Sequence, residues 1–256
     1  MLADLRGFVF DLDGCVWQGS TLNPGAADTL TALHRGGRGV AFLTNNSRAT
    51  GAGMRDKLQR LGVTFAEHVL TPLEILGTVI AERFGRSRVL VMGAPEMAEV
   101  VAAAGHDVLE AKDYREATVV AVGNDFDLSY DRLAAASRAA ARGAPLVTPN
   151  LDPRLPIEDG DFMPGCGAIV AAVAAAAGVR PIVVGKPERP LFDIALRRLG
   201  VAPFEAAMVG DSLESDIAGA RAVGMRTVYY APAGAPGSVA DVVIRSFAEL
   251  SALAGV

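Results

Sequence analysis

Cysteine and histidine are scarce in this sequence, which holds two cysteines and three histidines among 256 residues. Cys15 and Cys166 are too few to build a disulfide framework. The histidines lie far apart in the chain, so they offer no zinc-type spacing, and we assign them no role. Thiols without a disulfide framework are typical of a reducing compartment, and we therefore expect a cytoplasmic protein.

An excess of positive charge is also lacking. The chain has 24 Lys and Arg against 29 Asp and Glu, and its basic residues are scattered. A nucleic-acid partner is not expected, because such proteins carry a basic patch. The most apolar stretch, Ala168 to Val179, is shorter than the roughly 20 residues of a membrane span. Asp4 and Arg6 interrupt the N-terminal region before any apolar run, so neither a membrane anchor nor an export signal is expected.

Short apolar runs, in contrast, are abundant in a chain that is 51% hydrophobic. They are rich in Val, Phe and Leu and end at Gly, Asn, Asp or Pro, which is typical of buried parallel strands. Eight such runs occupy residues 7–13, 39–46, 88–93, 117–124, 144–150, 181–187, 206–211 and 226–230. Helical periodicity fills the segments between them, as at Leu191, Ile194, Ala195 and Leu199. The sequence therefore predicts an α/β fold with a doubly wound, Rossmann-like parallel sheet.

No Ser-rich or Pro-rich linker marks a domain boundary. The division into domains is therefore inferred from the strands and helices that each segment contains. The segment from about residue 71 to residue 180 has strands and helices of its own. We predict a core domain made of residues 1–70 and 181–256, with residues 71–180 as an inserted α/β domain. Prolines at both junctions are candidate hinges.

Acidic residues follow two of the predicted strands. Asp11 and Asp13 are one residue apart at the end of the first run, and residues i and i+2 of a strand point to the same side. Asp211 follows a later run. In a doubly wound sheet, the carboxyl ends of the strands gather around the ligand. Oxygen ligands of this kind suit Mg²⁺, so Asp11, Asp13 and Asp211 form a candidate metal site.

Other strand ends carry groups suited to an anion. Thr44 and Asn45 offer a hydroxyl and an amide, Asn46 follows them, and Lys186 supplies a compact positive charge. These groups, with the metal, predict a site for a phosphoryl group.

Four segments carry a resemblance to a known family: DLDGCVW, LTNNS, VVGKP and GDSLESD. Their order and approximate spacing resemble the four motifs of the haloacid dehalogenase (HAD) superfamily, over nearly the whole chain. The sequence is most similar to the branch with a large α/β cap inserted between the second and third motifs. This branch includes 4-nitrophenylphosphatases and phosphatases of phosphoglycolate, glycerol 3-phosphate, pyridoxal phosphate and nucleotides. The resemblance implies an Mg²⁺-dependent phosphatase of a small-molecule phosphate monoester, and it leaves open which ester is hydrolysed and whether the chain forms a homodimer.

The resemblance also implies roles for the acidic residues. Asp11 would be the nucleophile that forms an aspartyl-phosphate. Asp13 would protonate the leaving alcohol, deprotonate the attacking water and bind the metal through its backbone carbonyl. The carboxylates of Asp11 and Asp211 would ligate Mg²⁺.

The same resemblance extends to the neighbouring positions. Thr44 and Asn45 would hold the phosphoryl oxygens, and Lys186 would offset negative charge. Asp216 would support Lys186 or a metal-bound water. Gly14 would let the backbone approach the metal and phosphate closely.

Several alternatives remain at the level of sequence. A dehalogenase or a phosphomutase could use the same fold, and a receiver-like switch would phosphorylate Asp11 without turnover. Cys15 stands where the family usually has Thr and is interpreted as a buried thiol rather than a redox group. Trp17 belongs either to a flap that gates the site or to a packed core. Asn150 and Asp152 resemble a cap motif of the family, although a turn would use the same residue types.

Overall fold

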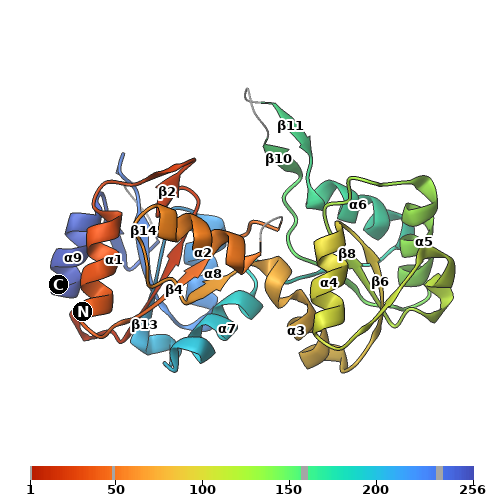
Figure 1. Ribbon diagram of the computed structural model, residues 1–256, viewed down its shortest axis with the longest axis horizontal. Coiled ribbons are helices and arrows are strands. Elements are labelled where there is room, and N and C mark those ends of the chain that lie inside the picture. The colour runs from red at the N-terminus through yellow and green to blue at the C-terminus, as the bar shows by residue number, and fades with distance from the viewer. Residues whose placement is uncertain (1, 48–49, 157–160, 235–238) are drawn as a thin grey trace. The chain divides into compact units, whose positions relative to one another are not determined.

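The chain forms two compact units in a computed structural model that describes residues 2–47, 50–156, 161–234 and 239–256 (Figure 1). The first unit comprises Met1–Thr44, Gly51–Thr71 and Lys186–Val256, and the second comprises Asn45–Thr50 and Pro72–Gly185. The second unit thus includes residues 45–50, which we had expected in the core, and it extends past the expected boundary at residue 180. The reason for the extension is that strand β12 (Ile182–Val183) pairs with the sheet of the second unit.

A six-stranded parallel sheet forms the centre of the first unit, in the order β15-β14-β13-β1-β4-β5. Its strands are β1 (Gly7–Asp11), β4 (Gly39–Leu43), β5 (His68–Leu70), β13 (Ala206–Gly210), β14 (Arg226–Tyr230) and β15 (Val242–Ile244). From β1 the chain first adds strands on one side, β4 and then β5, and later adds β13, β14 and β15 on the other. This reversal confirms the predicted doubly wound sheet and makes the β1/β13 boundary its switch point.

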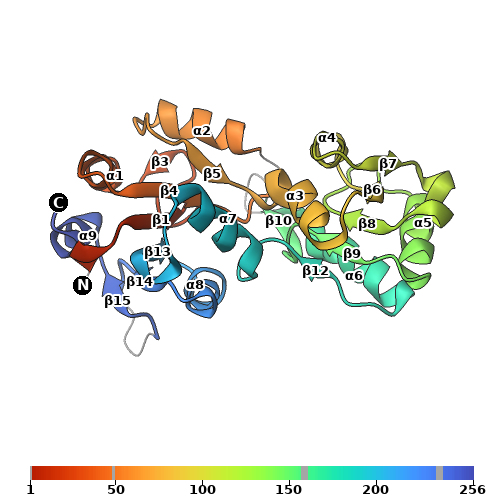
Figure 2. The ribbon, with the colours of Figure 1, turned by 90° about the horizontal axis from the view of Figure 1, so that it is seen from below.

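Helices cover both faces of this sheet. They are α1 (Ala26–Arg35), α2 (Gly51–Arg60), α7 (Arg189–Leu199), α8 (Ala218–Val223) and α9 (Phe247–Ala254). Helix α1 packs on α9 and α7 packs on α8, on opposite sides of the sheet (Figure 2). Phe8, Val9 and Phe10 of β1 are completely buried, which explains why this strand is apolar without alternation. A short antiparallel hairpin, β2 (Trp17–Gln18) and β3 (Thr21–Leu22), follows β1.

The second unit repeats the architecture with a five-stranded parallel sheet in the order β12-β9-β8-β6-β7. Its other strands are β6 (Arg88–Met92), β7 (Asp107–Leu109), β8 (Val119–Val122) and β9 (Leu146–Thr148). Its helices are α3 (Pro72–Phe84), α4 (Pro95–Ala103), α5 (Tyr130–Ala141) and α6 (Cys166–Ala177), with α3 packed on α4 and α5 on α6. An antiparallel hairpin, β10 (Arg154–Pro156) and β11 (Phe162–Pro164), precedes α6.

All eight predicted apolar runs contain strands of the two parallel sheets. Strands β5, β7 and β15, at the edges of the two sheets, were not predicted, because each has only three residues and forms no long apolar run. Residues 168–177 of the alanine-rich run belong to α6, which ends at Ala177 before Gly178. No helix among the described residues has both the length and the apolar character needed to cross a bilayer.

Helix α3 approaches α4 at Gly77, where a side chain has no room. A Cβ at this position would lie 2.5 Å from Cβ of Ala104 and 2.8 Å from the carbonyl oxygen of Val100. Replacing glycine by alanine inside a helix ordinarily stabilises it. Here we expect Gly77→Ala to lower the free energy of unfolding by about 1–3 kcal/mol, because the two helices must separate. Thermal or urea unfolding measures the change.

The matched control is Thr78→Ala, on the exposed face of the same helix. This substitution should change the free energy of unfolding by no more than about 0.5 kcal/mol. A Gly77→Ala variant that is as stable as the wild type would contradict the tight α3–α4 contact.

Candidate active site

The candidate site lies at the carboxyl edge of the first unit's sheet, at its switch point. Asp11 is the last residue of β1, and Asp211 directly follows β13. The two strands are parallel neighbours, with Phe10 paired to Val209, so their ends come together. This is the position at which ligands bind in doubly wound sheets.

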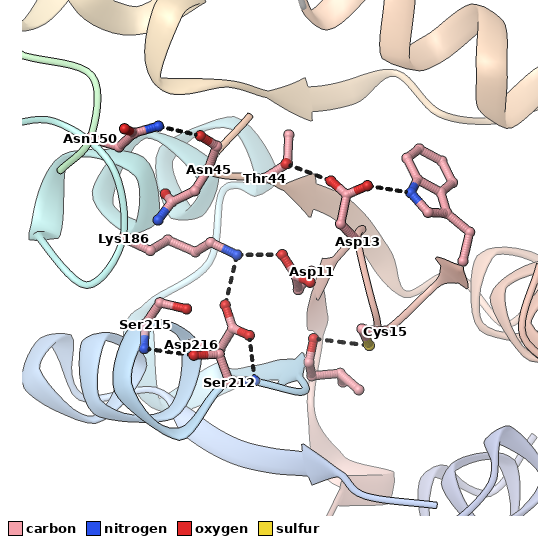
Figure 3. Close-up of polar contacts among 12 residues, drawn as sticks. Asp11, Asp13, Cys15, Thr44, Asn45, Asn150, Lys186, Ser212, Ser215 and Asp216 are labelled. Atoms are coloured by element: carbon pink, nitrogen blue, oxygen red, sulfur yellow. Dashed lines mark hydrogen bonds and ion pairs between the residues drawn. The ribbon is translucent and has the colours of Figure 1, made fainter. Parts of the chain in front are cut away.

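A buried lysine joins two carboxylates at this edge. The ammonium of Lys186 lies 2.5 Å from Oδ1 of Asp11 and 2.7 Å from Oδ1 of Asp216 (Figure 3). The second oxygen of Asp216 accepts a hydrogen bond from the backbone N–H of Ser212 at 3.1 Å. Lys186, Asp11 and Asp216 are 4%, 6% and 1% exposed. Buried charges require partners of opposite sign, and this arrangement gives every one of them such a partner.

Three carboxylates, those of Asp11, Asp211 and Asp216, meet at the site. Each offers one oxygen, and the three oxygens lie within 4.8 Å of one another. With a single ammonium beside them, the ionised cluster carries excess negative charge. Burial raises the pKa of Asp11 to about 8; Lys186 opposes this shift and Asp216 adds to it. Burial and the nearby Asp216 also raise the pKa of Asp211. Burial alone would lower the pKa of Lys186, but Asp11 and Asp216 raise it above its usual value, so the lysine stays charged.

Gly14 allows the backbone to pass close to this cluster. Its φ of 95° lies in the left-handed region, and a Cβ here would collide with the carboxylate of Asp211. The glycine of the first motif is therefore required by both conformation and space.

Asp13 is exposed, and its carboxylate is turned away from the acidic cluster. Its Oδ1 accepts a hydrogen bond from Nε1 of Trp17 at 2.8 Å, and its Oδ2 accepts one from Oγ1 of Thr44 at 3.1 Å. The three carboxylates that come together thus include Asp216, which the sequence suggested only as a supporting residue, in place of Asp13. Two donors hold the Asp13 side chain in a fixed orientation (Figure 3).

The sequence allowed two interpretations of Trp17, as part of a flap or as a packed aromatic residue. It did not predict the polar contact that Trp17 makes. The indole is completely buried, and its N–H reaches Asp13 four residues earlier because the chain turns into the β2–β3 hairpin. The ammonium of Lys57 lies 3.8 Å from the centroid of the ring and donates to the carbonyl of Gly19. Partial burial lowers the pKa of Lys57, against the opposing effect of Asp13. A tryptophan after a DxDG motif was the available signal for this contact.

The second motif is divided between the two units. Thr44 is buried in the first unit, whereas Asn45 and Asn46 belong to the second. The carbonyl of Asn45 accepts a hydrogen bond from Nδ2 of Asn150 at 2.8 Å. Oδ1 of Asn150 also accepts the backbone N–H of Asp152, as a turn requires. The expected contact between Asn45 and a phosphoryl group remains a prediction.

Cys15 is buried beside the acidic cluster. Its thiol donates to the carbonyl of Val209 at 3.6 Å. Burial, followed by the negative charge of Asp11, raises the pKa of Cys15 well above its usual value. The side chain is therefore a protonated thiol that packs against β13, and a redox role has no support from this geometry.

Comparisons with known proteins agree with the motifs. A family model described as haloacid dehalogenase-like hydrolase matches residues 8–107, and a second HAD-like hydrolase model matches residues 183–234. The human glycerol-3-phosphate phosphatase is 34% identical over 254 residues, which cover 89% of this chain and 79% of the relative. A sugar phosphatase of Bacillus subtilis is 32% identical over 222 residues, covering 86% of this chain and 81% of the relative.

Solved structures extend the likeness to the whole fold. The crystal structure of a 4-nitrophenylphosphatase from Thermotoga maritima matches with a TM-score of 0.87 and 28% identity, covering 99% of this chain and 98% of that one. The resemblance inferred from the four motifs is confirmed by these relatives. The chain therefore belongs to the haloacid dehalogenase-like hydrolases, within their phosphatase branch.

Proposed function

We propose that this chain hydrolyses a small phosphate monoester with Mg²⁺, through an aspartyl-phosphate on Asp11. The observation that carries the proposal is the buried Lys186, which is bound to Asp11 and Asp216 beside Asp211. Such a lysine offsets negative charge on the nucleophile and on the phosphoryl group that it attacks.

The first half-reaction transfers the phosphoryl group to the enzyme. Lys186 holds one oxygen of Asp11, and the other oxygen attacks phosphorus. The new O–P bond forms as the ester O–P bond breaks, and Asp13 gives its proton to the departing alkoxide. Trp17 and Thr44 orient the Asp13 carboxyl for this transfer.

The second half-reaction restores the enzyme. A water attacks the phosphorus of the aspartyl-phosphate, and Asp13, now ionised, takes the proton of that water. The bond between phosphorus and Asp11 breaks, inorganic phosphate leaves, and both carboxyl groups return to their starting states.

Mg²⁺ fits the donor set of the site. Asp11 and Asp211 supply hard oxygen ligands, and the excess negative charge of the cluster calls for a cation. Both oxygens of Asp216 already accept hydrogen bonds, from Lys186 and Ser212, so Asp216 is the residue that positions Lys186. Asp13 would contribute its backbone carbonyl. When bound, the ion polarises the phosphoryl oxygens and offsets their charge.

The names of the relatives support the substrate class. They include phosphatases of glycerol 3-phosphate and of sugars and a 4-nitrophenylphosphatase. We propose a small polyol or sugar phosphate as the substrate, and the second unit as a cap that closes over it and excludes water. A cytoplasmic location is consistent with the two buried free thiols.

Rival activities have separate signatures. A dehalogenase would release halide from a haloacid and needs no Mg²⁺, a phosphomutase would keep the phosphate on its product, and a receiver-like switch would hold a long-lived phospho-Asp11. The decisive assay is Mg²⁺-dependent release of inorganic phosphate from glycerol 3-phosphate, sugar phosphates, phosphoglycolate and nucleotides, ranked by kcat/KM.

Asp11→Asn removes the proposed nucleophile and nearly preserves its shape. We expect kcat to fall by about 10³-fold or more, with no covalent phosphate detected by mass spectrometry after rapid quenching. Asp28→Asn, on the exposed surface of α1, is the matched control and should keep full activity. Normal turnover by Asp11→Asn would refute the covalent mechanism.

Trp17→Phe keeps a buried aromatic ring but removes the N–H that Asp13 accepts. An alkyl leaving group needs the proton of Asp13, whereas 4-nitrophenolate departs without it. We therefore expect kcat for glycerol 3-phosphate to fall about tenfold, a change of about 1.4 kcal/mol, and kcat for 4-nitrophenyl phosphate to change much less. Equal losses on both substrates would point to a packing role for Trp17, and the melting temperature reports that role directly.

Mg²⁺ should stabilise the protein more at pH 8 than at pH 6. The raised pKa of Asp11, about 8, means that the metal-free folded state favours the protonated acid and loses stability as the pH rises from about 4 to 8. Mg²⁺ binds the ionised form of Asp11. At pH 6 the ion must therefore displace a proton from this carboxyl group, whereas at pH 8 a larger fraction of the protein is already ionised. A saturating ion should raise the melting temperature by about 3 °C or more at pH 8.

Thermal unfolding in EDTA and in Mg²⁺ at the two pH values measures this difference. Asp211→Asn should lose most of the Mg²⁺-dependent rise at both. A larger rise at pH 6 would contradict the assignment of Asp11 as a metal ligand.

A further inference from the structure

Lys57 reaches from α2 to the β2–β3 hairpin. Its ammonium donates to the carbonyl of Gly19, in the turn of the hairpin, at 2.8 Å and lies 3.8 Å from the centroid of the Trp17 ring. Both contacts attach this one side chain to the hairpin, and all three residues belong to the first unit.

The hairpin is small enough to need such an attachment. Each of its strands has two residues, and an isolated hairpin is at best marginally stable in water. Its turn, residues 19–20, is exposed. At the other end of the hairpin, Nδ2 of Asn23 donates to the carbonyls of Gly14 and Cys15. The base of the hairpin is therefore fixed within the first motif, and Lys57 fixes the turn from α2.

The attachment continues through the indole to Asp13. The Trp17 ring is completely buried; its N–H donates to Oδ1 of Asp13 at 2.8 Å, and the ammonium of Lys57 lies over its face. The two contacts use different parts of the ring, so they do not compete. A cation over the face also polarises the ring, which strengthens the N–H as a donor. Lys57 therefore affects both the position of the indole and its hydrogen bond to Asp13.

We propose that Lys57 is a positioning residue for proton transfer by Asp13 and that it acts through Trp17. This inference rests on the acid/base role proposed for Asp13. Lys57 holds the indole, the indole holds one oxygen of Asp13, and the other oxygen accepts from Thr44. Without the ammonium the indole is free to turn, and Asp13 points its proton at the leaving alkoxide less often. A lysine that bound the substrate would instead raise KM when removed.

The first test uses Lys57→Met, which keeps an unbranched side chain without the ammonium. We expect the single-turnover rate for glycerol 3-phosphate, or for whichever alkyl phosphate is hydrolysed fastest, to fall about fivefold while KM changes less than about twofold. The rate for 4-nitrophenyl phosphate should change less than about twofold, because 4-nitrophenolate departs without the proton. Lys57→Arg keeps a cation and should recover most of the rate. The matched control is Arg60→Met, which removes an equal charge from the exposed end of α2 and should behave like the wild type.

Action through Trp17 is tested by combining Lys57→Met with Trp17→Phe. Since Trp17→Phe already removes the N–H that Asp13 accepts, adding Lys57→Met should lower the rate by less than about 1.5-fold. A further fall of about fivefold in the double variant would overturn the inference. Equal losses on both esters, or a rise in KM as the main effect of Lys57→Met, would overturn it as well.

A second readout needs no activity, because Trp17 is the one tryptophan of the chain. Its indole N–H gives a single signal in the NMR spectrum of ¹⁵N-labelled protein. We expect this proton to exchange with water about tenfold faster in Lys57→Met than in the wild type, and at an unchanged rate in Arg60→Met. Lys57→Gln is also neutral and takes the place of Lys57→Met if that variant misfolds.

The NMR readout separates the two ways of failing. An indole N–H that exchanges at the wild-type rate in the neutral variants would overturn the role of Lys57, whatever the activity. A wild type that hydrolyses no phosphate ester would overturn the proposed function, while faster exchange in Lys57→Met would still support the hold of Lys57 on the indole.

Discussion

The contact on which the site depends is the buried ammonium of Lys186 between Asp11 and Asp216. Burying an unpaired charge in this environment would cost free energy, and two ionised carboxylates without a cation between them would repel each other. The lysine resolves both problems for two of the three carboxylates, and the third, Asp211, leaves a residual negative charge. Burial is the main reason why the pKa of Asp11 rises to about 8 in spite of its bond to Lys186, and the negative charges of Asp216 and then Asp211 add to the rise. The cluster is therefore balanced only when a further cation or a proton is present, which is the physical basis for proposing Mg²⁺.

The two units share a sheet topology but carry different side chains at the carboxyl edge of the sheet. In each, parallel strands depart in opposite directions from a central pair, and the connections at that pair leave a space at the carboxyl edge. In the first unit Asp11 and Asp211 occupy the edge, and the result is an acidic site. In the second unit Gly93 and Gly123 occupy the equivalent strand ends, and a cavity lined mostly by apolar residues lies beside them. The residues at the strand ends thus decide the chemical character of the space that the shared geometry leaves.

Much of this architecture could be predicted from the sequence, because buried parallel strands are apolar on both faces and their ends are marked by polar residues. Residues 181–187 were expected in the core domain, whereas β12 pairs with β9 of the second unit, because a two-residue strand carries no information about its neighbour. The convergence of Asp11 and Asp211 followed from the order of the strands. The orientation of Asp13 could not be predicted, because the hairpin that brings the Trp17 indole back to it is a feature of three dimensions.

Two aspartates one residue apart have different environments, and this difference supports a division of labour. Asp11 is 6% exposed and bound to an ammonium, so its ionised form has little surrounding water, which suits the nucleophile proposed for it. Asp13 is exposed at the surface of the first unit and is held by neutral donors, Trp17 and Thr44, which fix its direction. A group that must give a proton in one step and take one in the next needs such access to solvent and a fixed direction. A nucleophile needs the reverse, a site from which competing water is excluded. Placing the end of β1 inside the sheet and the next turn outside it gives each carboxylate the environment that its proposed role requires.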